Sequence, residues 1–339
     1  MIFSTNYLTS QNAVTPGNIQ LNSTFQHIAV HYNISGDVNE NSELSVSYRR
    51  SGAGNTFEPA APSVRATPGT IVDGDPLNRN YHAASILFLM PETTYDIQIV
   101  LTDPDGGGMT GTQQVTTRSI PTFAANAVQK YVIPGNGGVS GTVNDPYLGL
   151  QFAADQAQVG DVMNVLPGNY DAFELFTSGT IGQPIVFRAT QIHQAIIDGD
   201  NTNRGVVTLG VFNDSIQHII IDGFEIRNGQ WGIDAQNTQY LTVRNNKIED
   251  VDFGIVNRRA NGWEHDQYIV NNSWVGRTPW PQTAGQIPSE RCIDIRGNRN
   301  VVSFNFISNF GDGVTTDGPP YGVSYCLDIH NNDIINIVD

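Results

Sequence analysis

The chain has 339 residues, only 15% of them charged, and a formal net charge of −16. Such an acidic chain is repelled by nucleic acid and anionic membranes, which argues against a nucleic-acid-binding role. No apolar run reaches about 18 residues, so no membrane-spanning helix is expected, and two cysteines, Cys292 and Cys326, are too few for a disulfide framework.

The length suggests two domains, because a domain typically has about 100–200 residues. Frequent Gly and Asn with little charge favour an all-β protein with many tight turns. The first residues, MIFSTNYLTSQN, contain neither a basic nor an apolar stretch, so no signal peptide is visible.

Residues 1–118 have the pattern of a small β-sandwich. Apolar and polar side chains alternate over 28–34, 44–48 and 95–101, which is the period of half-buried strands. Turn-rich stretches such as SGDVNENS and DPDGGG separate these runs. Short strands broken by such turns are typical of a sandwich.

The stretch LMPETTYDIQI, from Leu89, resembles part of fibronectin type III modules, in which the tyrosine lies at a strand corner. The resemblance covers residues 1–118 and implies a fibronectin III-like module that acts as a spacer or docking domain. Residues 119–127 are expected to form a linker and residues 128–339 a second domain.

The second domain begins with a predicted helix, capped by Asn144 or Asp145 with Pro146 in its first turn, and ending before Gly160. The following sequence GDVMNVLPGNY resembles the opening turn of pectate-lyase-like proteins. That resemblance implies a right-handed parallel β-helix with a helix plugging its N-terminal end.

A repeat supports this architecture. Five segments pair Asn or Asp with a large apolar residue two positions later, at spacings consistent with a turn of about 25 residues. Because turns of a solenoid stack about 4.8 Å apart, one interior amide can bond to the next. We predict such a ladder through Asp222, Asn246, Asn272, Asn305 and Asn332. Beside it, we predict an interior stack of Ile248, Trp274, Ile307 and Ile334.

The sequence stops at Asp339, partway through a predicted turn. An open solenoid end has unpaired backbone groups that invite strand addition. We therefore expect that the natural chain continues or that another copy covers this end.

A second strand follows each ladder segment, in which Ile233, Ile255, Ile293 and Val314 are expected to point inward. Their neighbours then form two outward columns on one face. The first column is Asp234, Val256, Asp294 and Thr315. The second column is Gln236, Arg258, Arg296 and Asp317.

A long insertion between Val275 and Arg291 borders this face. Aromatic side chains beside polar residues are typical of surfaces on which sugars stack. The predicted sugar-binding residues are Trp263, His265, Trp274 and Trp280.

Two mechanisms fit the outward columns. In a lyase, Ca²⁺ held by Asp234, Asp294 or Asp317 would acidify the proton next to a uronate carboxylate before β-elimination. The resemblance to pectate-lyase-like enzymes implies Arg258 or Arg296 as the base, although a free guanidinium is a very poor base.

In a hydrolase, Asp294 and Asp317 would be the acid and base, roughly 8 Å apart by strand geometry, as in inverting glycosidases. The same charges also fit a mutually neutralising ladder on a scaffold.

The sequence therefore predicts an extracellular or cell-surface protein that acts on or binds a polysaccharide. The expected activity is that of a polysaccharide lyase or a glycoside hydrolase, with Ca²⁺ as the candidate cofactor. The alternative is a non-catalytic adhesin or self-assembling structural protein built on a β-helix.

Overall fold

The computed structural model describes residues 12–69, 71–72, 75–76, 79–138, 140–201, 205–210, 215–235, 238–257, 265–281, 289–316 and 326–338. The chain divides into two compact units, residues 1–120 and 121–339. Within the described ranges, regular structure consists of strands β1 to β30 and one six-residue helix. No helix found there is long and apolar enough to cross a membrane.

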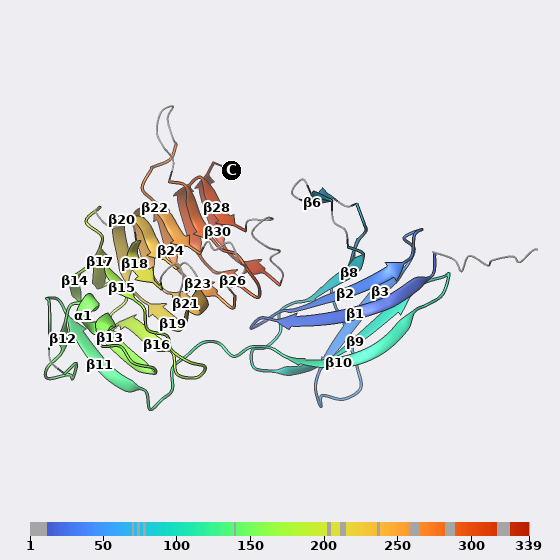
Figure 1. Cartoon of the computed structure of the whole chain (residues 1–339), viewed down its shortest axis with the longest axis horizontal. Helices are drawn as coiled ribbons and strands as arrows, with labels where there is room; N and C mark the ends of the chain where they lie inside the picture. Colours follow the sequence, from blue (N-terminus) through green and yellow to red (C-terminus); the bar gives the residue numbers. More distant parts are fainter. Residues whose placement is uncertain are drawn as a thin grey trace, which may run out of the picture. The chain divides into compact units, whose positions relative to one another are not determined.

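The first unit contains two antiparallel four-stranded sheets (Figure 1). One sheet has the order β1 (Val14–Ser23), β2 (Ile28–Gly36), β8 (Tyr81–Ile86), β5 (Val64–Ala66). The other has the order β10 (Met109–Thr116), β9 (Thr94–Thr102), β3 (Glu43–Arg50), β4 (Glu58–Pro59). A small hairpin pairs β6 (Ile71–Val72) with β7 (Asp75–Pro76).

The alternating apolar residues of both sheets bury one common cluster, as their period of two predicts. Ile28 and Ile97 are fully buried within it. The hydroxyl of Tyr95 accepts a hydrogen bond from the backbone N–H of Met90 at 3.0 Å, which ties the start of β9 to the preceding turn. The kinship with fibronectin type III modules remains a prediction.

A buried polar network lies at one side of this unit. The Asp37 carboxylate contacts the Ser42 hydroxyl at 2.5 Å and the Arg65 guanidinium at 2.8 Å. The Ser42 hydroxyl lies 2.9 Å from Nε2 of His82. Because His82 is buried beside Arg65, its pKa falls to about 4, and Asp37 only partly opposes this shift.

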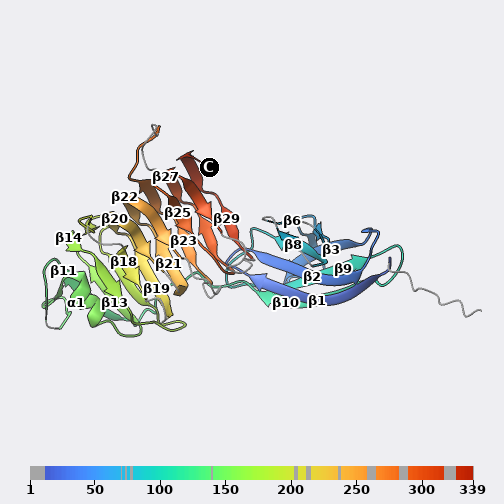
Figure 2. The same cartoon turned by 45° about the horizontal axis from the view of Figure 1, so that its top comes forward.

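The second unit is a parallel coil (Figures 1 and 2). Its first sheet stacks one strand from each turn. In spatial order these strands are β12 (Tyr147–Leu148), β11 (Val128–Ile133), β13 (Asp161–Val165), β16 (Ile185–Ala189), β19 (Ile216–Asp222), β21 (Thr238–Arg244), β23 (Tyr268–Val270), β26 (Val301–Ser303) and β29 (Asp328–His330).

The second sheet follows the same succession of turns. Its main path is β14 (Gly168–Asp171), β17 (Ala195–Asp198), β20 (Glu225–Asp234), β22 (Lys247–Val256), β24 (Ser273–Gly276), β27 (Phe306–Phe310) and β30 (Asp333–Ile337). Four more strands join it, namely β15 (Phe173–Leu175), β18 (Gly205–Leu209), β25 (Arg291–Asp294) and β28 (Asp312–Thr315).

The long strands β20 and β22 show how one sheet supplies two sides of the coil. Asn228 and Asp250 take left-handed backbone conformations, with φ of 57° and 55°. Residues before this point pair with β17 and β24, whereas residues from Trp231 and from Ile255 onward pair with β18 and β25. Each turn therefore has three strand segments, as in a parallel β-helix, and its right-handed sense stays a prediction.

The predicted amide ladder is present from Asn246 onward. Oδ1 of Asn272 accepts the backbone N–H of Asn246 at 2.9 Å, and Asn305 and Asn332 repeat this contact at 3.1 and 3.0 Å. Each side-chain amide also donates to a backbone carbonyl, for example Asn272 to Val243 at 2.9 Å. The ladder therefore satisfies backbone groups that are buried at this corner.

Asp222 is not part of the ladder, and the prediction was wrong there. Phe224 occupies the equivalent position, since its backbone N–H donates to Oδ1 of Asn246 at 2.9 Å. Asp222 instead pairs across strands with Arg244, with which it forms an ion pair at 2.8 Å. Of the predicted interior stack, Ile248, Trp274 and Ile307 are fully buried, whereas Ile334 is 43% exposed.

The predicted helix begins later than expected. Tyr147 and Leu148 form β12 and pair with β11, so the helix α1 spans Leu150–Asp155 with Gly149 at its N-cap. Its Leu150, Ala153 and Ala154 join the interior cluster of the coil. Its role as a plug of the coil's end remains a prediction.

The segment before β11 covers part of the outside of the first sheet. Phe123 and Ala127 pack on an outward apolar row formed by Val162, Val186 and Ile220. The Arg188 guanidinium lies 5.0 Å from the centre of the Phe123 ring, and Arg244 donates to the carbonyl of Pro121 at 3.0 Å. Residues 121–127, expected within a linker, thus belong to the second unit.

Replacing Asn272 with Ala should destabilise the second unit by about 3 kcal/mol, because the buried Asn246 N–H and Val243 carbonyl lose their partners. Urea denaturation followed by the fluorescence of the buried tryptophans would measure this loss. The exposed strand residue Asn169 provides the control, since Asn169→Ala should change stability by less than about 0.5 kcal/mol. Equal effects of the two variants would contradict the ladder's role.

Lowering the pH should destabilise the first unit through His82. Since its folded pKa lies below the unfolded value, the unfolded chain binds the proton first, and stability falls from about pH 6.5 towards pH 4. The loss between pH 7 and pH 5 should be about 2 kcal/mol. Calorimetry at both pH values would detect it as a lower melting temperature, and His82→Gln should show a smaller drop. An equal drop in the variant would refute the assignment to His82.

Candidate active site

The outward column expected on one side of the coil has the predicted register. Asp234 pairs with Val256, Val256 with Asp294, and Asp294 with Thr315. The neighbouring residues Ile233, Ile255 and Ile293 lie in the interior cluster, as predicted. The alternation of residues along the strands therefore predicted correctly which residues share this column.

A second outward column lies two positions before those isoleucines. It consists of Trp231, Phe253, Arg291 and Asp312. Between the column and the isoleucines the chain has Gly232, Gly254, Cys292 and Gly313. Cys292 lies in the interior cluster together with the next residue, Ile293, so strict alternation is broken at these positions. At Gly254, a Cβ atom would lie 2.7 Å from the Trp274 ring, so the core leaves no room for a larger side chain there.

We call the two columns together the site face. It comprises Trp231, Asp234, Phe253, Val256, Arg291, Asp294, Asp312 and Thr315. The four residues of the column with Trp231 were not among the predicted site residues. The signal was available, because each of them directly precedes an aligned second strand.

Apolar side chains occupy one part of the site face. The Trp231 and Phe253 rings meet edge to face with centroids 5.9 Å apart, and Val256 completes this small cluster. All three are buried although they lie outside the main core. This part of the face is therefore not a solvated polar surface.

Arg291 joins the carboxylates of the face. Its Nη1 lies 3.3 Å from Oδ2 of Asp294, and its Nε lies 3.4 Å from Oδ2 of Asp312. The Asp294 side chain is fully buried, whereas those of Arg291 and Asp312 are 31% and 36% exposed. The expectation that Asp294 faces solvent was therefore wrong. Strand alternation predicts on which side of the strand a side chain lies, but it does not predict whether other residues cover that side chain.

The other charged residues predicted for the site are either buried or outside the described part of the chain. Arg296 is also buried, and its backbone carbonyl accepts a hydrogen bond from Asn300 at 2.7 Å. Arg258 and Asp317 lie outside the described residues. Within the part of the chain that is described, no three His, Cys, Asp or Glu side chains converge as a metal site would require.

The predicted sugar-binding aromatics have different environments. Trp274 is fully inside the coil, where its Nε1 lies 3.3 Å from Oδ1 of Asn305, so it presents no ring to a ligand. Trp280 is 46% exposed, and His265 is partly exposed. Trp263 lies outside the described residues.

The insertion that carries Trp280 is held at its base. Arg277 contacts Asp250 at 3.1 Å and donates to Oδ1 of Asn201 at 2.9 Å. Ser289 is fully buried and accepts a hydrogen bond from the backbone N–H of Thr278 at 3.1 Å. These contacts fix where the insertion leaves β24 and where it returns to β25.

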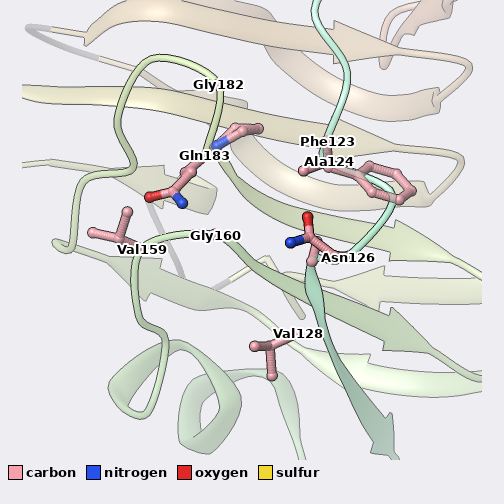
Figure 3. Close-up of a pocket in the computed structure, with 10 residues that line it drawn as sticks. Phe123, Ala124, Asn126, Val128, Val159, Gly160, Gly182 and Gln183 are labelled. Carbon is pink, nitrogen blue, oxygen red and sulfur yellow. The ribbon is translucent and has the colours of Figure 1, made fainter.

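A hollow elsewhere on the second unit has a different character. Figure 3 shows the side chains of Asn126 and Gln183 on two sides of it. Its lining contains no ionisable side chain, so it offers no acid or base. The lining residues are Phe123, Ala124, Asn126, Ala127, Val128, Val159, Gly160, Gly182, Gln183 and Pro184.

Comparisons with known proteins give partial similarity. No family model matches the chain. The pectate lyase PEL9 of Emericella nidulans is 30% identical over 146 residues, which cover 36% of this chain and 35% of that enzyme. The chain therefore spans about a third of the length of this relative.

Two solved structures are similar at a lower level. An alginate lyase from Paenibacillus sp. str. FPU-7 has a TM-score of 0.36 and 20% identity over 56% of this chain and 72% of its own. A purple acid phosphatase from yellow lupin has a TM-score of 0.24 and 17% identity over 48% and 29% of the two chains. Likeness at this level carries no argument about fold or activity.

The Arg291→Gln variant should lose about 2 kcal/mol of stability, because the buried Asp294 carboxylate loses a charged partner. Combining it with Asp294→Asn should cost less than the sum of the two single changes. Urea denaturation of all three variants gives the coupling energy. Lys247→Gln, which breaks ion pairs with Glu225 and Glu249 at the coil surface, is the control and should cost less than about 1 kcal/mol. Strict additivity would contradict the pairing.

Proposed function

We propose that the protein is a polysaccharide lyase that cleaves an acidic polysaccharide by β-elimination on the site face. The observation that carries this proposal is Arg291, a partly exposed cation between Asp294 and Asp312 on that face. The partial similarity to an enzyme named as a pectate lyase supports the same reaction class. The fold alone would not, since one fold serves many activities.

The chemistry needs a cation near the substrate's carboxylate. Removing the proton on the adjacent carbon places negative charge on that carboxylate, and a fixed guanidinium stabilises this charge. Arg291 provides such a group on a chain whose net charge is −16, while Asp294 and Asp312 offset its charge. Its two carboxylate neighbours hold the guanidinium in place before the substrate arrives.

Sugar binding would use the insertion beside the face. Trp280 offers an exposed ring, and the contacts of Arg277 and Ser289 fix the base of the segment that carries it. A planar ring stacks well on the apolar face of a sugar. We therefore propose Trp280 as a substrate-binding residue, together with Trp263 as the sequence predicts.

Calcium is part of this proposal as a cofactor of the reaction. Asp234 and Asp317 are its proposed ligands, since Asp294 is directed to Arg291. By resemblance to the pectate-lyase-like enzymes, Arg258 and Arg296 remain candidates for the base. We further propose an extracellular location and a fibronectin III-like spacer or docking role for the first unit.

A panel of acidic and neutral polysaccharides, each with Ca²⁺ and with a chelator, tests the proposal. A lyase produces a C4–C5 double bond that absorbs in the ultraviolet, whereas a hydrolase produces new reducing ends without this absorbance. We expect absorbance with a uronate polymer. New reducing ends alone would favour the hydrolase instead, and no reaction with any polymer would favour the adhesin or structural role.

Trp280→Ala should raise KM for the cleaved polymer about tenfold and change kcat much less, because the lost ring contributes mainly to binding. Initial rates over a range of substrate concentrations separate the two constants. Phe176, which is exposed on an early turn, offers a matched control, and Phe176→Ala should alter KM by less than about twofold. A similar KM for the Trp280 variant and the wild type would remove Trp280 from the binding site.

A further inference from the structure

The hollow shown in Figure 3 is bounded by three separate segments of the second unit. Residues 123–128, which end at the start of β11, form the first wall. The turn at Val159 and Gly160, between α1 and β13, forms the second wall, and residues 182–184, just before β16, form the third. The hollow has a volume of about 400 Å³, part of it open to solvent. We call this recess the amide hollow.

The first wall is held against the outside of the coil. The Phe123 side chain packs on the outward apolar row of the first sheet, and the Arg188 guanidinium lies 5.0 Å from the centre of its ring. Further along the wall, the backbone N–H of Ala127 donates to the Ala124 carbonyl at 3.0 Å. This hydrogen bond closes a turn that contains Asn126, so the backbone fixes the point from which the Asn126 side chain extends.

The other two walls are tight turns that hydrogen bonds close. Thr180 and Gln183 exchange two backbone hydrogen bonds, at 3.0 and 2.9 Å, around Gly182, which has a left-handed φ of 75°. In the second wall, the backbone N–H of Asp161 donates to the Gln158 carbonyl at 3.0 Å, and the Asp161 carboxylate accepts the Gln158 N–H at 2.9 Å. All three walls are therefore formed before a ligand arrives, so binding requires little further ordering of the backbone.

Two side-chain carboxamides, those of Asn126 and Gln183, lie on two sides of the amide hollow (Figure 3). Both side chains are exposed, and neither amide has a hydrogen-bond partner among the residues that the structure describes. Each amide offers two N–H donors and one carbonyl acceptor. Because the fold does not use these groups, they are available to a ligand in the hollow.

Apolar side chains surround the two amides. Pro184 lines the hollow from the third wall, and Val128 and Val159 line it from the other two. Val128 is 56% exposed and Val159 is 46% exposed, although they come from different segments and border the same recess. Apolar walls with a few hydrogen-bonding groups at fixed positions are the usual composition of a small-molecule site.

The chemistry of the lining favours a neutral ligand. The described residues that line the hollow include no ionisable side chain, so neither an anion nor a cation would meet a charged partner. The net charge of −16 further disfavours an anion. A neutral sugar ring matches the lining, because its hydroxyl groups both donate and accept hydrogen bonds, as the carboxamides do. Its C–H groups match the apolar walls.

The amide hollow is separate from the site face. Gln183 directly precedes Pro184 and β16, whereas Arg291 starts β25, which the chain follows with β26. The first sheet has four steps between β16 and β26, or about 19 Å at about 4.8 Å a step. A sugar in the hollow would thus lie several turns away from Arg291, and the hollow is not a part of the site face.

We propose that the amide hollow is a second, non-catalytic binding site that takes a neutral sugar residue. The amides of Asn126 and Gln183 bond to neighbouring hydroxyl groups of the sugar, and the C–H groups of the ring contact the apolar walls. The site would hold a carbohydrate chain on the protein without cleaving it. This inference goes beyond the proposed lyase function and does not depend on it.

Titration of the whole chain with neutral disaccharides tests the proposal. Cellobiose, maltose, lactose and xylobiose are the probes, and saturation-transfer nuclear magnetic resonance detects binding as weak as a single small site gives. At least one of them should bind with a Kd on the order of 1 mM. Digalacturonate, which carries two carboxylates, should not displace the bound neutral sugar, because the hollow has no cation to pair with it.

Two variants locate the bound sugar. Asn126→Ala and Gln183→Ala should each raise the Kd by at least about fivefold, since each removes one hydrogen-bonding group from the hollow. Both side chains are exposed, so the melting temperature should move by less than about 2 °C. Asn169 is an exposed carboxamide on β14 that does not line the hollow, and Asn169→Ala should leave the Kd within about 1.5-fold of the wild type.

Three results would overturn the proposal. An unchanged Kd in both Asn126→Ala and Gln183→Ala would place the bound sugar elsewhere on the protein. A lack of binding by all four disaccharides at about 20 mM, roughly twentyfold above the expected Kd, would show that the hollow is not a sugar site. Displacement by digalacturonate would contradict the preference for a neutral ligand. The titration measures binding alone, so a wild type that cleaves no uronate polymer would end the lyase proposal and leave this one standing.

Discussion

The hydrogen bonds between turns at the ladder corner are the constraint on which the second unit depends. Each turn buries backbone N–H and carbonyl groups at this corner that its own residues cannot satisfy. The asparagine of the next turn satisfies them, as Asn272 does for Asn246 and Val243. Because an unpaired buried group costs about 1–3 kcal/mol, each turn needs its neighbour, and the turns stay in register.

That register places the residues of the site face next to one another. Residues far apart in sequence, such as Asp234 and Asp294, occupy one column because each turn begins again at the ladder. Arg291 then reaches Asp294 in its own turn and Asp312 in the next. In the same way, Arg299 reaches Asp266 from the following turn. The chemistry proposed for the site face uses side chains whose spacing the backbone fixes.

The interior of the coil was more predictable from sequence than its surface. Asn246, Asn272, Asn305 and Asn332 share a spacing because each must meet its neighbour. Asp222 was wrongly predicted to be a ladder residue. Its turn has Phe224 at the ladder position, and there only the backbone N–H takes part in the ladder. All inward positions lie in the same environment, the core, so the spacing of suitable residues in the sequence predicts them.

Outward positions of the site depend on what covers them, which strand alternation does not encode. Asp294 points away from the core as predicted, yet its side chain is fully buried. His265 drew attention as a neighbour of Trp263, whereas its contact with Asp266 depends on a left-handed bend without a glycine or asparagine. The insertion before Arg291 shows what this architecture allows: β24 ends at Gly276 and β25 starts at Arg291, yet both strands pair with β22, with a single register shift between Glu249 and Val251. Excursions at such corners can lengthen or change composition without disturbing the coil, so the segments that border the site face can differ between related chains while the strand scaffold stays the same.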